Sequence, residues 1–118
     1  MSVHISVLMN ETIRGLDIQP DDIIIDGTIN GGGHAYEISK RLSDKGVLIG
    51  IDQDSTGLEV SRGKLKDATT TVHLVHDNTR NISDILSDLD IQKYDKLLNA
   101  PSFKESLFCV PLVSMKLK

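Results

Sequence analysis

The chain has 118 residues, a length that fits one domain, and 39% of its residues are hydrophobic, which is enough for a packed core. A formal charge of −4 and an aromatic content of 3% argue against a nucleic-acid-binding surface of basic and base-stacking side chains within these residues. Cys109 is the only cysteine and no apolar run approaches the roughly 18 residues of a membrane span. We therefore expect a cytoplasmic protein with no disulfide, no metal site and no membrane partner.

The first third of the chain predicts a helix, a strand, a loop and a second helix. Residues 6–16 place apolar side chains at i, i+4 and i+7, as in a short amphipathic helix. The β-branched run 23–25 has no polar alternation, which is typical of a strand buried on both faces of a parallel sheet. Residues 26–33 are rich in glycine and predict a loop, and apolar residues at helical spacing over 35–42 predict the next helix.

The same alternation continues to residue 98. We expect strands over 47–51, 71–75 and 94–98, with helices from Asp54 or Thr56 to about Leu65 and over 82–89. Alternation of this kind predicts an α/β fold with about four parallel strands joined by right-handed crossovers. Residues 99–118 show neither period, so we expect an irregular tail there. The fourth strand would then present an unpaired apolar edge, through which the chain could self-associate.

The strongest local signal is Asp26 at a strand end, followed by Gly31–Gly33 and a helix. Glycines let the backbone approach a ligand where a Cβ would clash, and a helix amino terminus offers free N–H groups. Asp52 ends the second strand nineteen residues after Gly33, about the spacing at which an acid accepts hydrogen bonds from ribose hydroxyls. The arrangement predicts an adenosine-containing cofactor. The alternative is a tight turn followed by an unrelated surface aspartate.

The kind of cofactor follows from what surrounds the glycines. The loop contains neither the G-x-G-x-x-G pattern of dinucleotide sites nor the Gly-Lys-Ser/Thr of a phosphate-binding loop. Asp26 would repel a pyrophosphate and would suit the positively charged sulfonium and ammonium groups of S-adenosylmethionine. We therefore expect S-adenosyl-L-methionine.

Four patterns occur in order along residues 4–98. They are H-I-S-V-L-M-N-E at 4–11, D-G-T and then G-G-G-H within 26–34, G-I-D-Q-D at 50–54 and L-V-H-D-N at 74–78. Together they resemble the motifs H-x-P-V-L-L-x-E, D-G-T-x-G-x-G-G-H-S, G-I-D-x-D and L-V-H-G-N-F. These motifs belong to the bacterial family that methylates the exocyclic amine of a cytosine in small-subunit (16S) ribosomal RNA. Four separated matches are more specific than any single loop.

The resemblance implies a Rossmann-like class I methyltransferase sheet, S-adenosyl-L-methionine as cofactor, and ribosomal RNA of the small subunit as partner. The cofactor-binding residues that it implies are Gly31, Gly32, Gly33, His34, Asp52 and Thr79. Thr79 stands where the family commonly has a phenylalanine beside the adenine. The matching segments identify no catalytic residue.

Several positions depart from the family pattern. Asn30 replaces a glycine, Ala35 a serine and Asp77 a glycine, and Thr79 lacks an aromatic face. After Leu98 the family continues with D-L-G-x-S-S, which is absent here. We therefore expect residues 1–98 to be a truncated cofactor-binding domain, residues 99–118 to be a divergent tail, and the chain to be an inactive fragment.

Two alternatives stay open from the sequence. The chain could be a non-catalytic, degenerate nucleoside-binding module. Residues 99–103, N-A-P-S-F, could also be an amine-binding turn like the Asn/Asp-Pro-Pro-Tyr/Phe turn of other amino-group methyltransferases, although the extra residue disrupts the tight turn. His73 and His76 lie three residues apart on a strand and so point to opposite faces, which argues against a metal pair.

Overall fold

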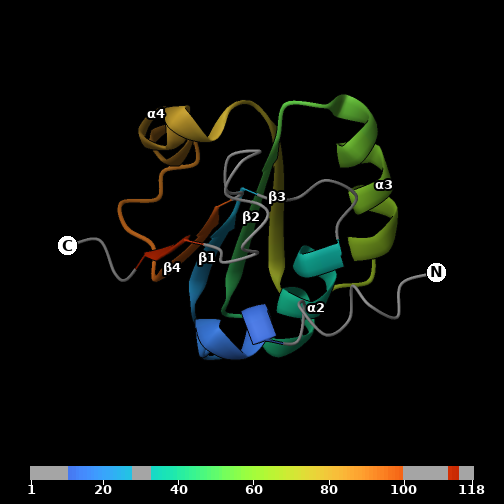
Figure 1. The fold of residues 1–118 in the computed structure, drawn as a ribbon, viewed down its shortest axis with the longest axis vertical. Helices are drawn as coiled ribbons and strands as arrows, with labels where there is room; N and C mark the ends of the chain where they lie inside the picture. The colour runs from blue at the N-terminus through green and yellow to red at the C-terminus, as the bar shows by residue number, and fades with distance from the viewer. Residues whose placement is uncertain (1–10, 28–32, 100–111, 115–118) are drawn as a thin grey trace.

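The computed structural model describes residues 11–27, 33–99 and 112–114 (Figure 1). Residues 11–16 are helical, which agrees with the carboxyl-terminal part of the helix expected over 6–16; the rest of that helix lies outside the described residues. The elements that follow are β1 (Ile23–Asp26), α2 (Gly33–Arg41), β2 (Val47–Asp52), α3 (Ser55–Leu65), β3 (Thr71–His76), the 3-10 helix η1 (Thr79–Asn81), α4 (Ile82–Asp88), β4 (Lys96–Asn99) and β5 (Leu112–Ser114).

The strands form one sheet in the order β3-β2-β1-β4-β5. β1 pairs in parallel with β2 on one side and with β4 on the other, and β2 pairs in parallel with β3. Each of these parallel neighbours is reached through a crossover that contains a helix, because parallel strands cannot be joined by a tight turn. The α/β fold with four parallel strands is therefore confirmed.

The fifth strand corrects two expectations about the end of the chain. β5 pairs antiparallel with β4, with Leu98 opposite Val113. The prediction of an irregular tail was therefore wrong for residues 112–114, and β4 lies between β1 and β5 instead of forming the edge of the sheet. The strand is only three residues long and follows Pro111, so it is too short to produce a readable alternation in the sequence.

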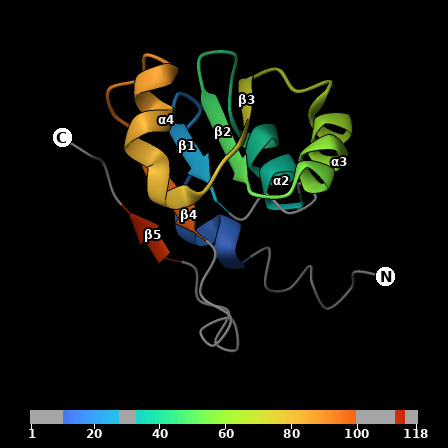
Figure 2. The same ribbon diagram turned by 90° about the horizontal axis from the view of Figure 1, so that it is seen from above.

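Helices cover both faces of the sheet (Figure 2). The helical residues 11–16 share one hydrophobic cluster with α2 and α3, whereas α4 packs on the opposite face. The first cluster consists of Ile13, Leu16, Ile24, Ala35, Ile38, Leu42, Leu48, Leu58, Leu65 and Leu98. The second consists of Ile25, Ile49, Ile51, Ile85, Leu86, Tyr94 and Leu97. Successive residues of one strand, such as Ile24 and Ile25, thus contribute to opposite clusters.

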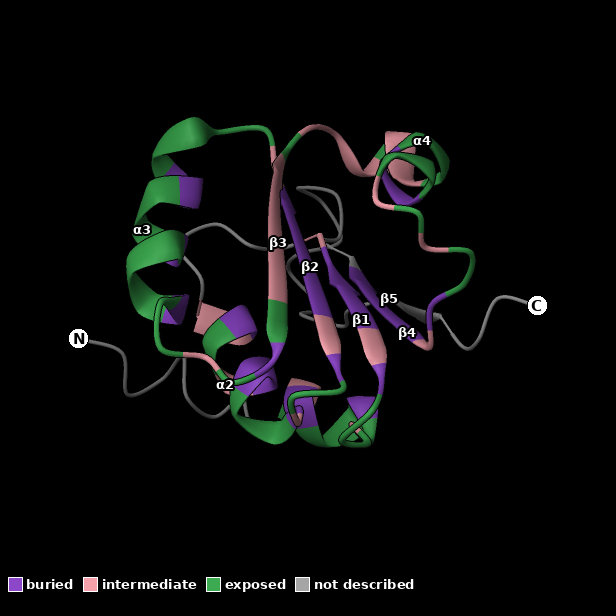
Figure 3. Cartoon of the chain, turned by 180° about the vertical axis from the view of Figure 1, so that it is seen from behind, coloured by how far each residue is buried: buried purple, intermediate pink, exposed green. Residues whose placement is uncertain are grey.

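Burial decreases from the centre of the sheet toward β3 (Figure 3). Ile24 and Ile25 of β1 and Leu48 and Ile49 of β2 are fully buried. Residues 72–75 of β3 are only half-buried, because β3 has a strand neighbour on one side within the described sheet. The continuous apolar runs of β1 and β2 are therefore explained by helices on both faces.

Local interactions fix where the elements begin. Asp54 is the N-cap of α3 and its side chain accepts a hydrogen bond of 2.9 Å from the Thr56 amide, so Asp54, not Thr56, caps this helix. α2 begins at Gly33, two residues before the expected start. Before β2, a Cβ at Gly46 would lie 2.7 Å from the Pro20 carbonyl oxygen, so this approach of two backbone segments requires a glycine.

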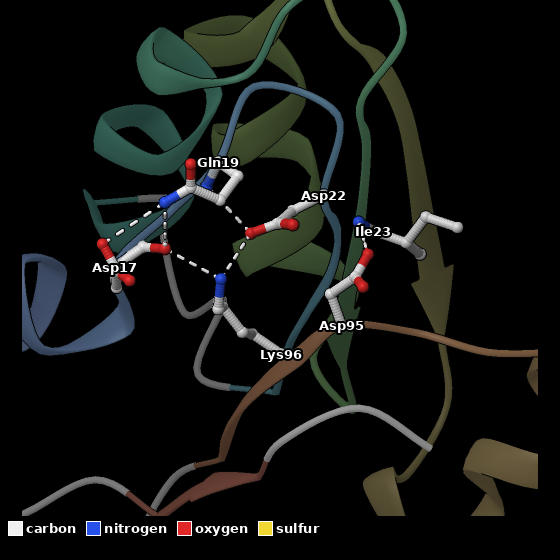
Figure 4. Close-up of polar contacts among 6 residues, drawn as sticks. All are labelled: Asp17, Gln19, Asp22, Ile23, Asp95 and Lys96. Carbon is white, nitrogen blue, oxygen red and sulfur yellow. Dashed lines mark hydrogen bonds and ion pairs between the residues drawn. The ribbon is translucent and has the colours of Figure 1, made fainter. Parts of the chain in front are cut away.

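A buried ion pair joins β4 to the segment that leads into β1 (Figure 4). The Lys96 ammonium lies 2.6 Å from Asp22 Oδ2 and donates a second hydrogen bond of 2.8 Å to the Asp17 carbonyl. Asp22 Oδ2 also accepts from the Gln19 amide at 2.9 Å. The side chains of Lys96 and Asp22 are only 10% and 11% exposed, so each charge depends on the other for compensation.

We expect Lys96→Met to lower the free energy of unfolding by about 3 kcal/mol or more, because it leaves the Asp22 carboxylate buried without its cation. The double variant Lys96→Met/Asp22→Asn should recover part of this loss, since no charge is then left uncompensated. Lys93→Met, at an exposed position, is the matched control and should change stability little. Urea unfolding followed by circular dichroism measures all three; equal stability of Lys96→Met and Lys93→Met would contradict the assignment.

Candidate functional site

The carboxyl ends of the parallel strands bring the candidate polar residues to one edge of the sheet. β1 ends at Asp26, β2 at Asp52 and β3 at His76. In the register of the sheet Asp26 lies opposite Gly50, and Asp52 lies opposite His76. The strand order changes direction at β1, from which the chain first builds β2 and β3 on one side and then β4 on the other. In open α/β sheets such a switch point is where ligands bind.

Asp26 lies at the switch point itself. The Gly27 amide donates a hydrogen bond of 2.7 Å to the Leu98 carbonyl, which holds the ends of β1 and β4 together. The Asp26 side chain is fully buried. Its carboxyl group therefore lies below the surface of this edge, between the ends of β2 and β4.

Asp52 carries the clearest indication of a missing contact. Its Oδ1 accepts a hydrogen bond of 2.9 Å from the Asp54 amide, which fixes the carboxylate over the turn into α3. Its Oδ2 is buried, and the structure gives it no hydrogen-bond partner within the described part of the chain. Buried carboxylate oxygens are normally paired, because an unmade hydrogen bond costs about 1–3 kcal/mol. Asp52 Oδ2 is thus suited to accept a hydrogen bond from a ligand hydroxyl.

Two hydrogen bonds connect the ends of β2 and β3. The Asp77 amide donates to the Asp52 carbonyl at 3.0 Å, and His76 Nε2 lies 2.9 Å from the Gln53 carbonyl. Since a carbonyl only accepts, this ring nitrogen is the donor. The backbone that directly follows the Asp52 side chain is therefore held by the end of β3 and the residue after it.

The Asp77 side chain closes the turn that follows β3. Its Oδ1 accepts hydrogen bonds of 2.7 Å from the Asn78 amide and from Asn81 Nδ2. The hydrogen bond from Asn81, followed by that from the Asn78 amide, lowers the pKa of the Asp77 carboxyl. Partial burial opposes this shift and the nearby His76 ring adds to it weakly. Asp77 therefore stays ionised at lower pH than an ordinary aspartate, and the stability that its ionised form adds is lost only as the pH falls through the lowered pKa.

Thr79 begins the 3-10 helix that this turn leads into. Asn78 is the N-cap of this 3-10 helix, and its side chain accepts a hydrogen bond of 2.9 Å from the Arg80 amide. Thr79 is half-buried and lies three residues after His76, which ends β3. The structure thus places Thr79 on the same edge of the sheet as Asp52.

The glycine-rich loop is described only at its end. Gly31 and Gly32 lie outside the described residues, whereas Gly33 and His34 open α2 and are half-buried. α2 packs against the same face of the sheet as α3. Gly33 and His34 therefore stand where the chain enters α2 after leaving β1.

The other residues singled out from the sequence have different positions. Asn99 ends β4 and pairs with Leu112, while residues 100–103 of the possible amine-binding turn lie outside the described residues. His73 lies opposite Ile49 in the sheet.

Among the described residues, no cluster of three or more His, Cys, Asp or Glu side chains is placed to hold a metal ion. The described helices include none with the length and apolarity to cross a membrane.

Sequence reasoning missed the role of His76 and Asp77. It treated Asp77 only as a departure from a family pattern and His76 as a strand residue. The available signal was the pair Asp77-Asn78 directly after a strand, because Asp and Asn side chains readily bond to backbone amides a few residues on. The contact from His76 to Gln53 joins residues 23 positions apart and has no local signal.

Comparison with known sequences supports the family resemblance of the four sequence motifs. The sequence pattern of the family described as the MraW methylase family matches residues 1–100. The ribosomal RNA small subunit methyltransferase H of Clostridium botulinum (strain Okra / Type B1) is 50% identical over 95 residues, which are 80% of this chain and 30% of that protein. The ribosomal RNA small subunit methyltransferase H 2 of Agathobacter rectalis is 46% identical over 95 residues. The chain spans about 30% of the length of these curated relatives.

Solved structures share this fold, among them a methyltransferase homologue from Pyrococcus horikoshii, which matches with a TM-score of 0.63 at 26% identity over 81% of this chain and 30% of that one. TrmN from Thermus thermophilus matches with a TM-score of 0.68 at 21% identity, over 87% of this chain and 30% of that one. NSun6 from Pyrococcus horikoshii matches with a TM-score of 0.61 at 34% identity, over 80% of this chain and 23% of that one. The Rossmann-like methyltransferase sheet is thereby confirmed. Since the family pattern covers residues 1–100, the chain belongs to the MraW methylase family.

Proposed function

We propose that this chain binds S-adenosyl-L-methionine at the carboxyl edge of its sheet, as the cofactor-binding part of a ribosomal RNA methyltransferase. The observation that carries the proposal is the buried Asp52 Oδ2 without a hydrogen-bond partner within the described residues, at the end of the strand beside the switch point. A ribose hydroxyl would supply the missing donor. Membership of the MraW methylase family and the named relatives support the same cofactor class.

The proposed site is assembled from three neighbouring segments. Gly31, Gly32, Gly33 and His34 would approach the cofactor from the loop between β1 and α2. Asp52 would accept hydrogen bonds from the ribose, and Thr79 would lie beside the adenine. The buried carboxyl group of Asp26 would favour a cationic ligand over a pyrophosphate at this edge. The cofactor supplies the methyl group when bound; the residues of this chain hold and orient it.

The proposed acceptor is the exocyclic amine of a cytosine in ribosomal RNA of the small subunit. The relatives named for methylation of that RNA subunit support the RNA class, and the four motifs support the cytosine amine. Methyl transfer requires the acceptor within about 3–3.5 Å of the methyl group, in line with the bond that breaks. Residues 1–98 are proposed to supply all the cofactor contacts, whereas β5 extends the same sheet outside the proposed site.

The first test concerns the ligand. We expect S-adenosylmethionine, or its demethylated product, to bind about tenfold or more tightly than NAD or ATP, a difference of about 1.4 kcal/mol or more. The reason is that Asp26 would repel a pyrophosphate at this edge, while the loop lacks a phosphate-binding pattern; the ribose that Asp52 would bind is common to all these ligands. Titration calorimetry with the four ligands measures this order. Tighter binding of NAD would overturn the proposal.

The second test concerns the ribose contact. Asp52→Ala should weaken cofactor binding by about 1.5–3 kcal/mol, the scale of a charge-assisted hydrogen bond to a buried group. Asp54→Ala is the matched control: it removes the cap of α3, at a cost of about 1 kcal/mol in stability, but leaves the backbone amide that bonds to Asp52. Calorimetric affinities and unfolding midpoints should therefore separate the two variants. Equal losses of affinity would show that the ribose acid is misassigned.

The third test concerns catalysis. We expect the 118-residue chain alone to transfer no methyl group to small ribosomal subunits. Its net charge of −4 and aromatic content of 3% provide little to hold a polyanion or an unstacked base. Incubation of the purified chain with radiolabelled cofactor and small subunits measures this. Turnover above background would show that residues 99–118, together with the sheet edge, supply the acceptor site.

A further inference from the structure

Asp77 connects Asp52, the candidate ribose-binding acid, to the turn that carries Thr79, the candidate residue beside the adenine. Its amide reaches back to the Asp52 carbonyl at 3.0 Å. Its carboxylate reaches forward to the Asn78 amide and Asn81 Nδ2, each at 2.7 Å. Thr79 lies between these two forward contacts in the chain. One residue thus bonds to the end of β2 and encloses the turn that carries Thr79.

The turn of residues 77–81 contains no apolar side chain of its own; Val75 before it and Ile82 after it pack against the second hydrophobic cluster. β3 is half-buried and both of its terminal residues are exposed. The 3-10 helix η1 contains no buried residue. Because little apolar surface fixes the turn, its polar contacts determine where Thr79 stands relative to Asp52.

We propose that Asp77 is a positioning residue of the cofactor site, which holds the turn carrying Thr79 in a fixed place relative to Asp52. This inference rests on the proposed function, since it assigns the two sides of an adenosine site to Asp52 and Thr79. Asp77 acts through the backbone and through Asn81, not by contact with the cofactor. A preformed site binds more tightly because the ligand does not have to order it.

The role requires an acceptor oxygen at residue 77, not a charge. Asparagine keeps the Oδ1 acceptor and can receive both the Asn78 amide and Asn81 Nδ2. Alanine removes it and keeps only the backbone bond to Asp52. Asp77→Asn and Asp77→Ala therefore separate a positioning role from an electrostatic one.

The experiment compares the wild type, Asp77→Ala, Asp77→Asn and Asp88→Ala, which removes an exposed acid at the end of α4. Affinity for S-adenosylhomocysteine is measured by calorimetry, at a temperature where thermal unfolding shows every variant folded. Amide hydrogen exchange of the ligand-free chain reports the order of residues 78–81. Asp77→Ala should bind about tenfold more weakly, with faster exchange in the turn, whereas Asp77→Asn and Asp88→Ala should stay within about twofold of the wild type.

A double-mutant comparison adds a readout that general destabilisation would not change. Asn81→Ala should weaken binding in the wild-type background and have no further effect on Asp77→Ala, because Asn81 acts through its hydrogen bond to the Asp77 carboxylate, which the second variant lacks. Additive losses would overturn the inference, as would an Asp77→Asn variant as weak as Asp77→Ala. Wild-type affinity in Asp77→Ala would overturn the inference alone. A wild type that does not bind S-adenosylhomocysteine would overturn the proposed function and the inference with it.

Discussion

The structure depends on the burial of β1 between two parallel neighbours. Ile24 and Ile25 are fully buried on opposite faces, and the strand is paired with β2 and β4 along its length. Both hydrophobic clusters therefore meet at this strand, one beneath α2 and α3 and one beneath α4. Polar residues can stand only at the ends of such a strand. This is why Asp22 comes directly before β1 and Asp26 is its last residue. The position of the candidate site is thus a consequence of where β1 stops being apolar.

The acids at the two edges of the sheet, Asp22 before β1 and Asp52 at the end of β2, have different surroundings. At the amino end, Asp22 is compensated by Lys96, and the surrounding backbone is held by hydrogen bonds from Gln19 and Lys96. At the carboxyl edge, Asp52 of the neighbouring strand has one oxygen bonded and the other buried without a partner in the described part of the chain. The buried charge at the amino end is compensated by an opposite charge, whereas the carboxyl edge keeps an acceptor that a ligand can use. This difference separates structural acids from the candidate binding acid.

The sequence predicted the elements whose patterns are local and long enough to read. The β-branched run of β1, the alternation up to residue 98 and the acid at the end of β2 all follow from residues close together in the chain. It did not predict β5, because three residues next to a proline carry no period and their strand forms only when β4 is present as a partner. Nor did it predict the ion pair of Lys96 with Asp22, 74 residues apart, or the contact of His76 with Gln53. Such contacts depend on the register of the finished sheet.

The departures from the family pattern acquire a physical meaning when they are placed in the structure. Thr79 cannot offer the aromatic face that the resemblance leads one to expect beside an adenine, so it would give a base in the proposed site no surface for stacking. Asp77, at a position where the pattern has glycine, adds two hydrogen bonds that order the same turn. Order supplied by the protein can replace part of the affinity that a ligand contact would have supplied, because less entropy is lost on binding. The two departures lie two residues apart in one turn, and they are better understood together than as independent losses.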